Sequence, residues 1–344
     1  MEKKIEKKGL VSWIKNKWEN NPMFSTIFAL LVLVIVQAIV MGGLSGSFAG
    51  MWGKLGKAWL NILRNNTYQG LMALGMCFAI ISGGIDLSVG STLCALGAIL
   101  MALIDPGKGI LQAVGITGAP AYIIAILLII VIGYLLGSIN GVLIAYGKLP
   151  PFIATLGTMK IFRSVTQQLT KTFSPEIPAG FKALTSFKLN GQVFLPIVYW
   201  IVIVIVMHII FKKTAFGRQT IAIGSNERAA KLSGINVAKV KSKIYGLVGV
   251  MCAFATIIYV SRIGAMDFAN AGSGYEMDAI AAVIVGGTAM SGGRGSLIGA
   301  FIGMLIMGVM NNILNSVGVP TFLCDAIKGA IIIFAVMLQK KDNV

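Results

Sequence analysis

Apolar stretches fill most of this chain and are separated by short polar ones. A helix needs about 20 apolar residues to cross the hydrocarbon core of a bilayer, and windows that approach this length recur along the sequence. They cover 24–41, 62–81, 88–104, 121–145, 152–169, 193–211, 244–262, 277–290, 295–317 and 321–338. The pattern therefore predicts an all-α polytopic membrane protein with about ten transmembrane helices. The window at 152–169 is the weakest, because it carries Lys160 and Arg163, and a charge at the bilayer centre costs about 2.5–3.5 kcal/mol.

Composition agrees with this class. Of the 344 residues, 56% are hydrophobic and 12% charged, and the mean hydropathy is +0.85, which excludes an ordinary soluble domain. The net charge of +17 does not indicate nucleic-acid binding, because the cations gather at the amino terminus, in one long loop and at the carboxyl tail. Membrane orientation and contact with anionic lipid explain that distribution.

The basic residues also predict the topology. Residues 1–22 form a basic amphipathic segment with Trp13, Ile14 and Trp18, which we interpret as cytoplasmic sequence rather than a signal peptide. Ten spans then place both termini and the basic loop 212–243 in the cytoplasm, as the positive-inside rule requires. We expect a single transmembrane domain over 23–344, located in the bacterial inner (plasma) membrane.

The loop 212–243 contains the signals of a short helix. Ser225 or Asn226 can cap its start, Glu227 suits the positive end of the helix dipole, and Gly234 can end it. A rigid helix presented to the cytosol is typical of a docking element. An interfacial amphipathic helix without a partner is the alternative.

Glycine occurs in two kinds of pattern. Stripes spaced by four, at Gly133, Gly137 and Gly141 and again at 295, 299 and 303, predict close helix packing. The turns at 83–91 and 286–296 break apolar stretches, and they suggest two inverted halves, with chance similarity as the alternative. The second turn lacks the Gly-Lys-Ser/Thr ending of a phosphate loop, so we exclude nucleotide binding there. We interpret the glycine-rich stretch 42–57 as an extended outer loop.

Several motifs in order carry a family resemblance. They are GGIDLSVG at 83–90, NG at 140–141, PFIATLGTM at 151–159, the stretch 227–237 and GYEMDAIAA at 274–282. From about Leu60 to the carboxyl end the chain resembles the ribose and galactoside permeases of bacterial ABC importers. The resemblance implies a homodimer, a cytoplasmic ABC ATPase that binds the ATP, an extracytoplasmic sugar-binding protein, and no cofactor in the chain itself. It assigns ATPase coupling to Asn226, Glu227, Ala229, Ala230, Gly234 and Ile235, with the two alanines permitting close docking.

Polar residues within the apolar windows are candidates for the translocation path or its gate. These are Asp86, Ser88, Asn140, Thr155 and Thr158, together with Phe152 of the same motif. Asp86 can instead cap the helix that begins near Ser88, and inter-helix hydrogen bonds explain the others equally well. Asp325 and Lys328 lie three residues apart and can pair. Glu276 and Asp278, where a helix begins, can favour its positive end or contact the binding protein.

Other chemistry is not indicated. Cys77, Cys94, Cys252 and Cys324 lie singly in apolar stretches, and the only histidine, His208, ends one, so we expect no metal and no redox site. No nucleophile with a base and no paired carboxylates suggest an enzyme. The sequence predicts an ABC permease for a simple sugar such as ribose or galactose. Nucleosides or another small polar solute, and a secondary transporter, are the alternatives.

Overall fold

The computed structural model of the protein describes residues 22–45, 48–172, 174–189 and 191–341. The amphipathic segment predicted over 1–22 lies outside the described residues, apart from Pro22. Most of the described chain is helical, and the one sheet present there is a hairpin of β1 (Lys188–Leu189) and β2 (Gln192–Val193). The prediction of a helical membrane protein is confirmed.

The helices follow the predicted apolar windows closely. In chain order they are α2 (Pro22–Ser45), α3 (Phe48–Asn65), α4 (Thr67–Ile81), α5 (Val89–Ile104), α6 (Ile110–Ala113), α7 (Gly118–Ala145), α8 (Pro151–Leu169), α9 (Ala179–Ser186), α10 (Leu195–Lys213), α11 (Ala215–Ser225), α12 (Glu227–Leu232), α13 (Val237–Ile263), α14 (Tyr275–Val285), α15 (Leu297–Val317) and α16 (Thr321–Lys341).

Five described helices, α2, α7, α10, α13 and α15, are long and apolar enough to cross a membrane. α4 and α5 are apolar but shorter. α8 has 19 residues, but Lys160 and Arg163 lower its hydropathy. α14 has 11 residues and is too short to span a bilayer by itself. The count of ten spans stays a prediction.

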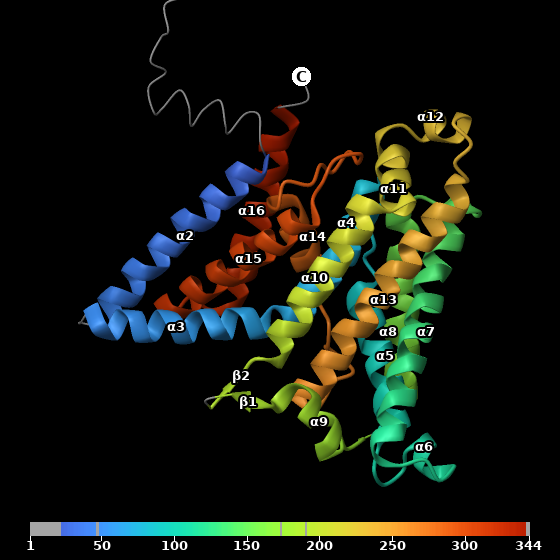
Figure 1. The fold of residues 1–344 in the computed structure, drawn as a ribbon, viewed down its shortest axis with the longest axis horizontal. Helices are drawn as coiled ribbons and strands as arrows, with labels where there is room; N and C mark the ends of the chain where they lie inside the picture. Colours follow the sequence, from blue (N-terminus) through green and yellow to red (C-terminus); the bar gives the residue numbers. More distant parts are fainter. Residues whose placement is uncertain (1–21, 46–47, 173, 190, 342–344) are drawn as a thin grey trace, which may run out of the picture.

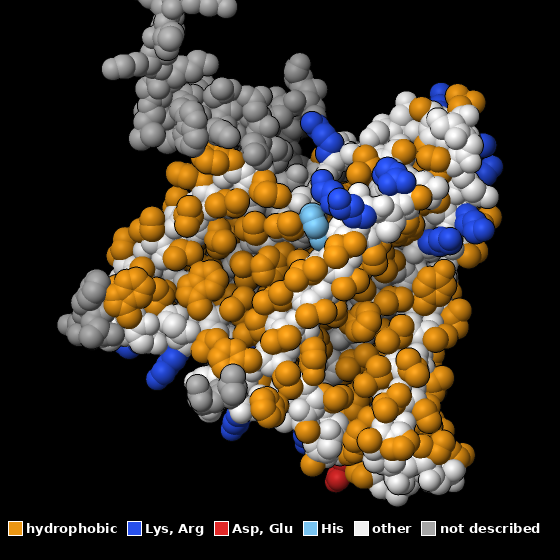
Figure 2. Space-filling model, viewed as in Figure 1, with side chains coloured by type: hydrophobic (Ala, Val, Ile, Leu, Met, Phe, Trp, Pro, Cys, Tyr) orange, Lys and Arg blue, Asp and Glu red, His pale blue; other side chains and the backbone are white. Residues whose placement is uncertain are grey.

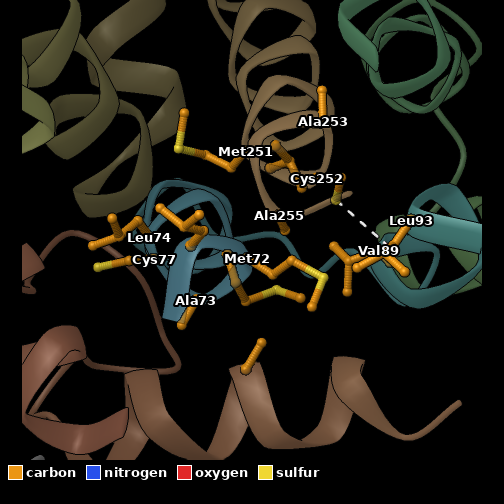
Figure 3. Close-up of a cluster of buried hydrophobic side chains, with 14 of the residues drawn as sticks. Met72, Ala73, Leu74, Cys77, Val89, Leu93, Met251, Cys252, Ala253 and Ala255 are labelled. Carbon is orange, nitrogen blue, oxygen red and sulfur yellow. Dashed lines mark hydrogen bonds between the residues drawn. The ribbon is translucent and has the colours of Figure 1, made fainter. Parts of the chain in front are cut away.

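The core forms where α13 packs against α4, α5 and α7. In Figure 3, Met72 and Cys77 of α4 lie below Met251 and Cys252 of α13. The Cys252 thiol donates to the carbonyl of Val89 on α5 at 3.6 Å. These side chains are essentially inaccessible to solvent. A core built this way is dry and close-packed, so it holds the helix ends in fixed positions.

The predicted glycine stripes are contacts between helix backbones. A Cβ added to Gly137 of α7 would lie 2.2 Å from the carbonyl oxygen of Tyr245 on α13, and one on Gly133 would lie 2.6 Å from that of Gly249. On α15, a Cβ on Gly303 would lie 1.9 Å from the carbonyl oxygen of Ala282 on α14. Both stripes therefore act as predicted, by letting helices approach more closely than any larger residue allows.

The interpretation of 42–57 as an extended loop is wrong. α2 continues to Ser45, and α3 begins at Phe48. Leu55, Ala58 and Ile62 of α3 are buried, while Trp52 and Lys57 are exposed. Spacing of three and four residues between buried positions is that of an amphipathic helix, and it outweighs the low helix propensity of the intervening glycines.

The two ends of the molecule differ. α12 lies at one end, where α2 also begins and α16 ends, whereas α6, α9 and the hairpin lie at the opposite end (Figure 1). Hydrophobic side chains cover the face between the ends, and basic side chains gather toward α12 (Figure 2). Ile39 of α2, Val131 of α7 and Ile205 of α10 are among the exposed apolar residues, as expected of a surface that faces lipid.

Candidate functional site

A buried polar network occupies the break between α4 and α5. One carboxylate oxygen of Asp86 accepts hydrogen bonds from the Ser88 hydroxyl at 2.6 Å and from the Ser88 backbone N–H at 2.8 Å. The amide of Asn140, on α7, donates to the Ser88 hydroxyl oxygen at 2.8 Å and to both carboxylate oxygens at 3.3 Å. Asp86, Ser88 and Asn140 are all at most 2% exposed.

α8 completes this network. The Thr158 hydroxyl donates to the Asn140 side-chain oxygen at 2.6 Å, so the Asn140 amide is used from both sides. Thr155 donates to the Pro151 carbonyl at 2.8 Å and lies 3.5 Å from the carbonyl oxygen of Ile85. The Tyr245 hydroxyl of α13 also donates to that oxygen, at 3.4 Å. Three helices, α7, α8 and α13, thus meet the break in the chain through hydrogen bonds.

Five of the six path candidates are therefore brought together, and Phe152 is not. Its side chain is 57% exposed on the outer face of α8. Asp86 accepts the N–H of Ser88, which precedes the first helical residue, so it stabilises the turn rather than capping the first turn of α5. Asp86, Ser88, Asn140 and Thr158 satisfy one another, and Thr155 bonds to backbone carbonyls. All five side chains are buried, so in this conformation they join helices rather than line an open path.

The helix α12 is built as the sequence indicates. The Asn226 side chain accepts the Ala229 N–H at 2.9 Å and caps the start. Gly234 has φ of +81°, and the Ile235 N–H reaches back to the Ala230 carbonyl at 3.1 Å. This left-handed turn ends the helix. A residue with a side chain could adopt the same conformation only at a cost in strain. Leu232, the last helical residue, is 89% exposed.

Ala230 differs from its expected role. Its side chain is only 4% exposed and belongs to the main core, and Ile235 packs partly against the same core. The small Ala230 thus lets α12 lie close to its own protein, and Ala229, which is exposed, is the alanine a partner could approach. Glu227 forms a 2.7 Å ion pair with Lys241 of α13, so it braces the loop, while its side chain stays 56% exposed.

Three chain segments meet beside this loop without intervening side chains. A Cβ added to Gly224, at the end of α11, would lie 1.7 Å from the carbonyl oxygen of Ile81 and 2.6 Å from the backbone nitrogen of Gly293. The Gly293 N–H in turn donates to the Ile81 carbonyl at 2.8 Å. We call this contact of residues 224, 81 and 293 the glycine junction. It joins α11 to both glycine-rich turns, 82–88 and 286–296.

Asp278 lies in the interior rather than on an outer surface. It is 9% exposed, accepts a hydrogen bond from the Gln69 amide at 2.8 Å and pairs with Lys328 of α16 at 3.2 Å. Its own protein covers most of the carboxylate in this conformation, and contact of Asp278 with the binding protein stays a prediction. The predicted Asp325–Lys328 pair is present at 3.3 Å. Glu276 is half-buried at the start of α14, and its role stays a prediction.

Residues 58–336 match the family model described as branched-chain amino acid transport system / permease component. That match covers most of the chain, including the polar network, α12 and the glycine junction. The chain belongs to this permease family. No solved structure matches the permease.

Individual relatives have narrower descriptions. The permease is 42% identical over 289 residues to the ribose import permease protein of Bacillus subtilis. The matched region covers 83% of this chain and 85% of the relative. It is 37% identical to the galactose/methyl galactoside import permease protein of Escherichia coli, over 81% of this chain and 85% of the relative. It is 34% identical to the xylose transport system permease protein of the same organism, over 81% of this chain and 84% of the relative. The resemblance to sugar permeases is confirmed.

Sequence reasoning missed the glycine junction and the Asp278–Lys328 pair. Gly224 stands in an unremarkable apolar helix, and no local signal shows that its neighbour is the end of α4. Asp278 and Lys328 are far apart in the sequence, so only a contact between helices relates them. α3 could have been found, because Leu55, Ala58 and Ile62 follow helical spacing.

Proposed function

We propose that this chain is the membrane-spanning subunit of an ABC importer that moves a simple sugar, such as ribose, galactose or xylose, into the cytoplasm. The observation that carries this is the 42% identity to a ribose import permease protein over 83% of the chain. The galactoside and xylose relatives widen the proposal to monosaccharides as a class. ATP binding and hydrolysis belong to a cytoplasmic partner ATPase, and this chain has no ATPase site of its own.

The proposed topology has ten membrane crossings, made by α2, α4, α5, α7, α8, α10, α13, α14, α15 and α16. The short α14 crosses together with the segments that flank it, and α3 lies along the extracytoplasmic side. Both termini are then cytoplasmic. Two features support this arrangement: α2 begins and α16 ends at the α12 end, and the basic loop 212–243 lies there too (Figures 1 and 2). Exposed apolar faces of α2, α7 and α10 contact lipid.

The ATPase docks on α12. The helix is capped at Asn226, ended at Gly234 and tied to α13 by the Glu227–Lys241 pair, so it moves as a rigid unit with α11 and α13, which flank it. Leu232, exposed at the end of α12, supplies an apolar anchor for the ATPase groove. The glycine junction then passes the motion to the turns after α4 and α14. Because backbone contacts backbone there, no flexible side chain absorbs the displacement.

The polar network serves as a latch on the translocation path. Asp86, Ser88, Asn140 and Thr158 hold the α4–α5 break against α7 and α8 in this conformation. Movement of the turn 82–88 would exchange these hydrogen bonds for others, which is how a packed element can have two discrete states. A second copy of the permease provides the other half of the path, and an extracytoplasmic sugar-binding protein delivers the solute.

The test is uptake of labelled ribose, galactose and xylose in cells that carry or lack this gene. ATP depletion and collapse of the proton gradient are applied separately, with leucine and a nucleoside as competitors. We expect sugar uptake that requires the gene and ATP and survives collapse of the gradient. Leucine is included because the family description names branched-chain amino acids.

Other outcomes assign other functions. Gene-dependent uptake that leucine or the nucleoside abolishes, with no sugar competing, would replace the sugar by that solute. Uptake that follows the proton gradient and ignores ATP would identify a secondary transporter, and α12 would then need another role.

A further inference from the structure

A cavity of about 800 Å³ opens between the last turns of α8 and the segment 264–274, which joins α13 to α14. α8 leads into α9, so the cavity lies in the half of the molecule away from α12 (Figure 1). Its walls are Ser164, Gln167, Gln168, Thr170, Lys171, Met266, Asp267, Phe268 and Ala269. The volume falls within the range of about 300–1,000 Å³ that small-molecule sites occupy.

The walls of this cavity are fixed in place. Arg163 donates to the Ala271 carbonyl at 2.6 Å, and the Gln167 amide donates to the Ala269 carbonyl at 3.2 Å. Further along the segment, Gly272 has φ of +75°, and a Cβ there would lie 2.3 Å from the carbonyl oxygen of Gly90 on α5. The segment 264–274 is thus clamped to α5 and α8, and a solute would not have to order it.

Most of the wall is polar but carries no net charge. Lys171 and Asp267 are the charged members, one of each sign. Hydrogen bonds from the Asn270 side chain and the Ala269 N–H lower the pKa of Asp267, which keeps it a hydrogen-bond acceptor at neutral pH. Amide and hydroxyl groups at Gln168 and Ser164 can both donate and accept. This combination suits a neutral solute with many hydroxyls, and Phe268 and Met266 offer an apolar surface for its C–H groups.

One stripe of α8 is also unsuited to lipid, although exposed apolar residues such as Ile161 and Val165 lie beside it. Ser164, Gln168 and Lys171 are exposed, as is Lys160 one turn earlier, while Ala154, Thr158 and Thr166 on the other side are buried. Positions 160, 164, 168 and 171 follow helical spacing, so they form one stripe. A charged side chain facing the middle of a bilayer costs about 2.5–3.5 kcal/mol, so this stripe belongs against water or protein.

We propose that this cavity is a binding site for the sugar on its way into the permease, with Ser164, Gln168 and Asp267 receiving its hydroxyl groups. The proposal rests on the proposed function, since it takes the cargo to be a sugar. It differs from the network at Asp86, whose polar groups are already paired with one another.

Thiol labelling tests the site directly. The native cysteines are all buried, so a cysteine introduced in the cavity is the reactive one among the described residues. Gln168→Cys is made in the full transporter, with its own ATPase and binding protein, in right-side-out membrane vesicles. The matched control is Gln112→Cys on α6, an exposed glutamine in a separate cavity of about 210 Å³ at the same end of the molecule. Saturating ribose, galactose or xylose should slow labelling of the first variant severalfold and leave the second unchanged.

Uptake by alanine variants gives a second readout. Gln168→Ala and Ser164→Ala should change the relative uptake rates of the three sugars, whereas Gln112→Ala should leave the ratios as in the unmodified chain. A folding defect would lower all three rates together without changing their ratios. If the unmodified chain takes up no sugar, the proposed function fails and this site fails with it.

If sugar is taken up, the site can fail alone. Equal labelling of Gln168→Cys with and without sugar, together with unchanged sugar ratios in both alanine variants, overturns it.

Discussion

Replacing Gly224 by alanine tests the glycine junction. The new methyl carbon would lie 1.7 Å from the carbonyl oxygen of Ile81, and both are held by backbone. Ordinary carbon–oxygen contacts are about 3.3 Å, so α11 and the end of α4 would have to separate by about 1.5 Å. Side-chain rotation cannot relieve the clash.

The expected cost combines two effects. Overpacking of this kind typically costs about 1–3 kcal/mol. The Gly293 N–H donates to the same Ile81 oxygen at 2.8 Å, and this hydrogen bond would be lost or weakened. Its loss adds about 1 kcal/mol to the destabilisation. Alanine gains about 1 kcal/mol over glycine in a helix, so the net loss is about 1–3 kcal/mol. The separation also disconnects α11 from the turns after α4 and α14.

Thermal unfolding in detergent and ATP-dependent uptake in cells provide the assays. Gly53→Ala is the matched control, because Gly53 is also helical and has nothing within 4 Å of its added Cβ. Gly224→Ala should melt below both the parent and the control, and it should take up less sugar per molecule in the membrane. Melting and uptake equal to those of Gly53→Ala would refute the rigid backbone contact.

Four further predictions follow from other contacts. Asn140→Ala should destabilise the protein by about 1–3 kcal/mol, because it leaves buried polar partners unsatisfied, and a melting temperature equal to that of the parent would contradict the network. Gly234→Trp should leave the protein in the membrane, because open space surrounds Gly234. The tryptophan strains the left-handed turn and should uncouple uptake from the ATPase. Normal uptake by this variant would show that α12 is not the docking helix. Burial by itself would raise the pKa of Asp105, but hydrogen bonds from the N–H groups of Lys108, Glu176 and Gly107 outweigh burial and hold this pKa below the ordinary value of 3.8. The ionised Asp105 carboxylate therefore stabilises the fold above pH 3.8, and this stabilisation is lost as the pH falls through the lowered pKa. Melting temperatures at pH 5 and pH 3 should therefore fall more for the parent than for Asp105→Asn, and equal falls would contradict the assignment. Lys328→Met should cost up to about 3 kcal/mol by leaving Asp278 without its cation, and adding Asp278→Leu should restore stability, whereas additive losses in the double variant would exclude a direct pair.

The sequence by itself determined the helices and the local signals at their ends. A long apolar stretch that lies in lipid or in the protein core forms a helix, because a backbone in hydrocarbon must satisfy its own hydrogen bonds. The cap at Asn226 and the stop at Gly234 are local chemistry, so their residue types were sufficient. The ordered motifs around Asp86, Asn140 and Thr158 were enough to identify the family, although not to show which of these groups contact one another.

Tertiary structure decided everything that depends on contacts between distant segments. The glycines of α3 are poor helix formers, and packing of Leu55 and Ile62 outweighs that preference, although the helical spacing of these residues is visible in the sequence. Ala230 and Asp278 looked accessible from their positions in the chain, but neighbouring helices bury both. Gly224 gained its significance from Ile81 and Gly293. The cavity beside α8 has its walls held by contacts between distant segments, such as that from Arg163 to the Ala271 carbonyl. A pattern along one helix specifies which face is polar or small, and the partner of that face is fixed only when the whole chain has packed.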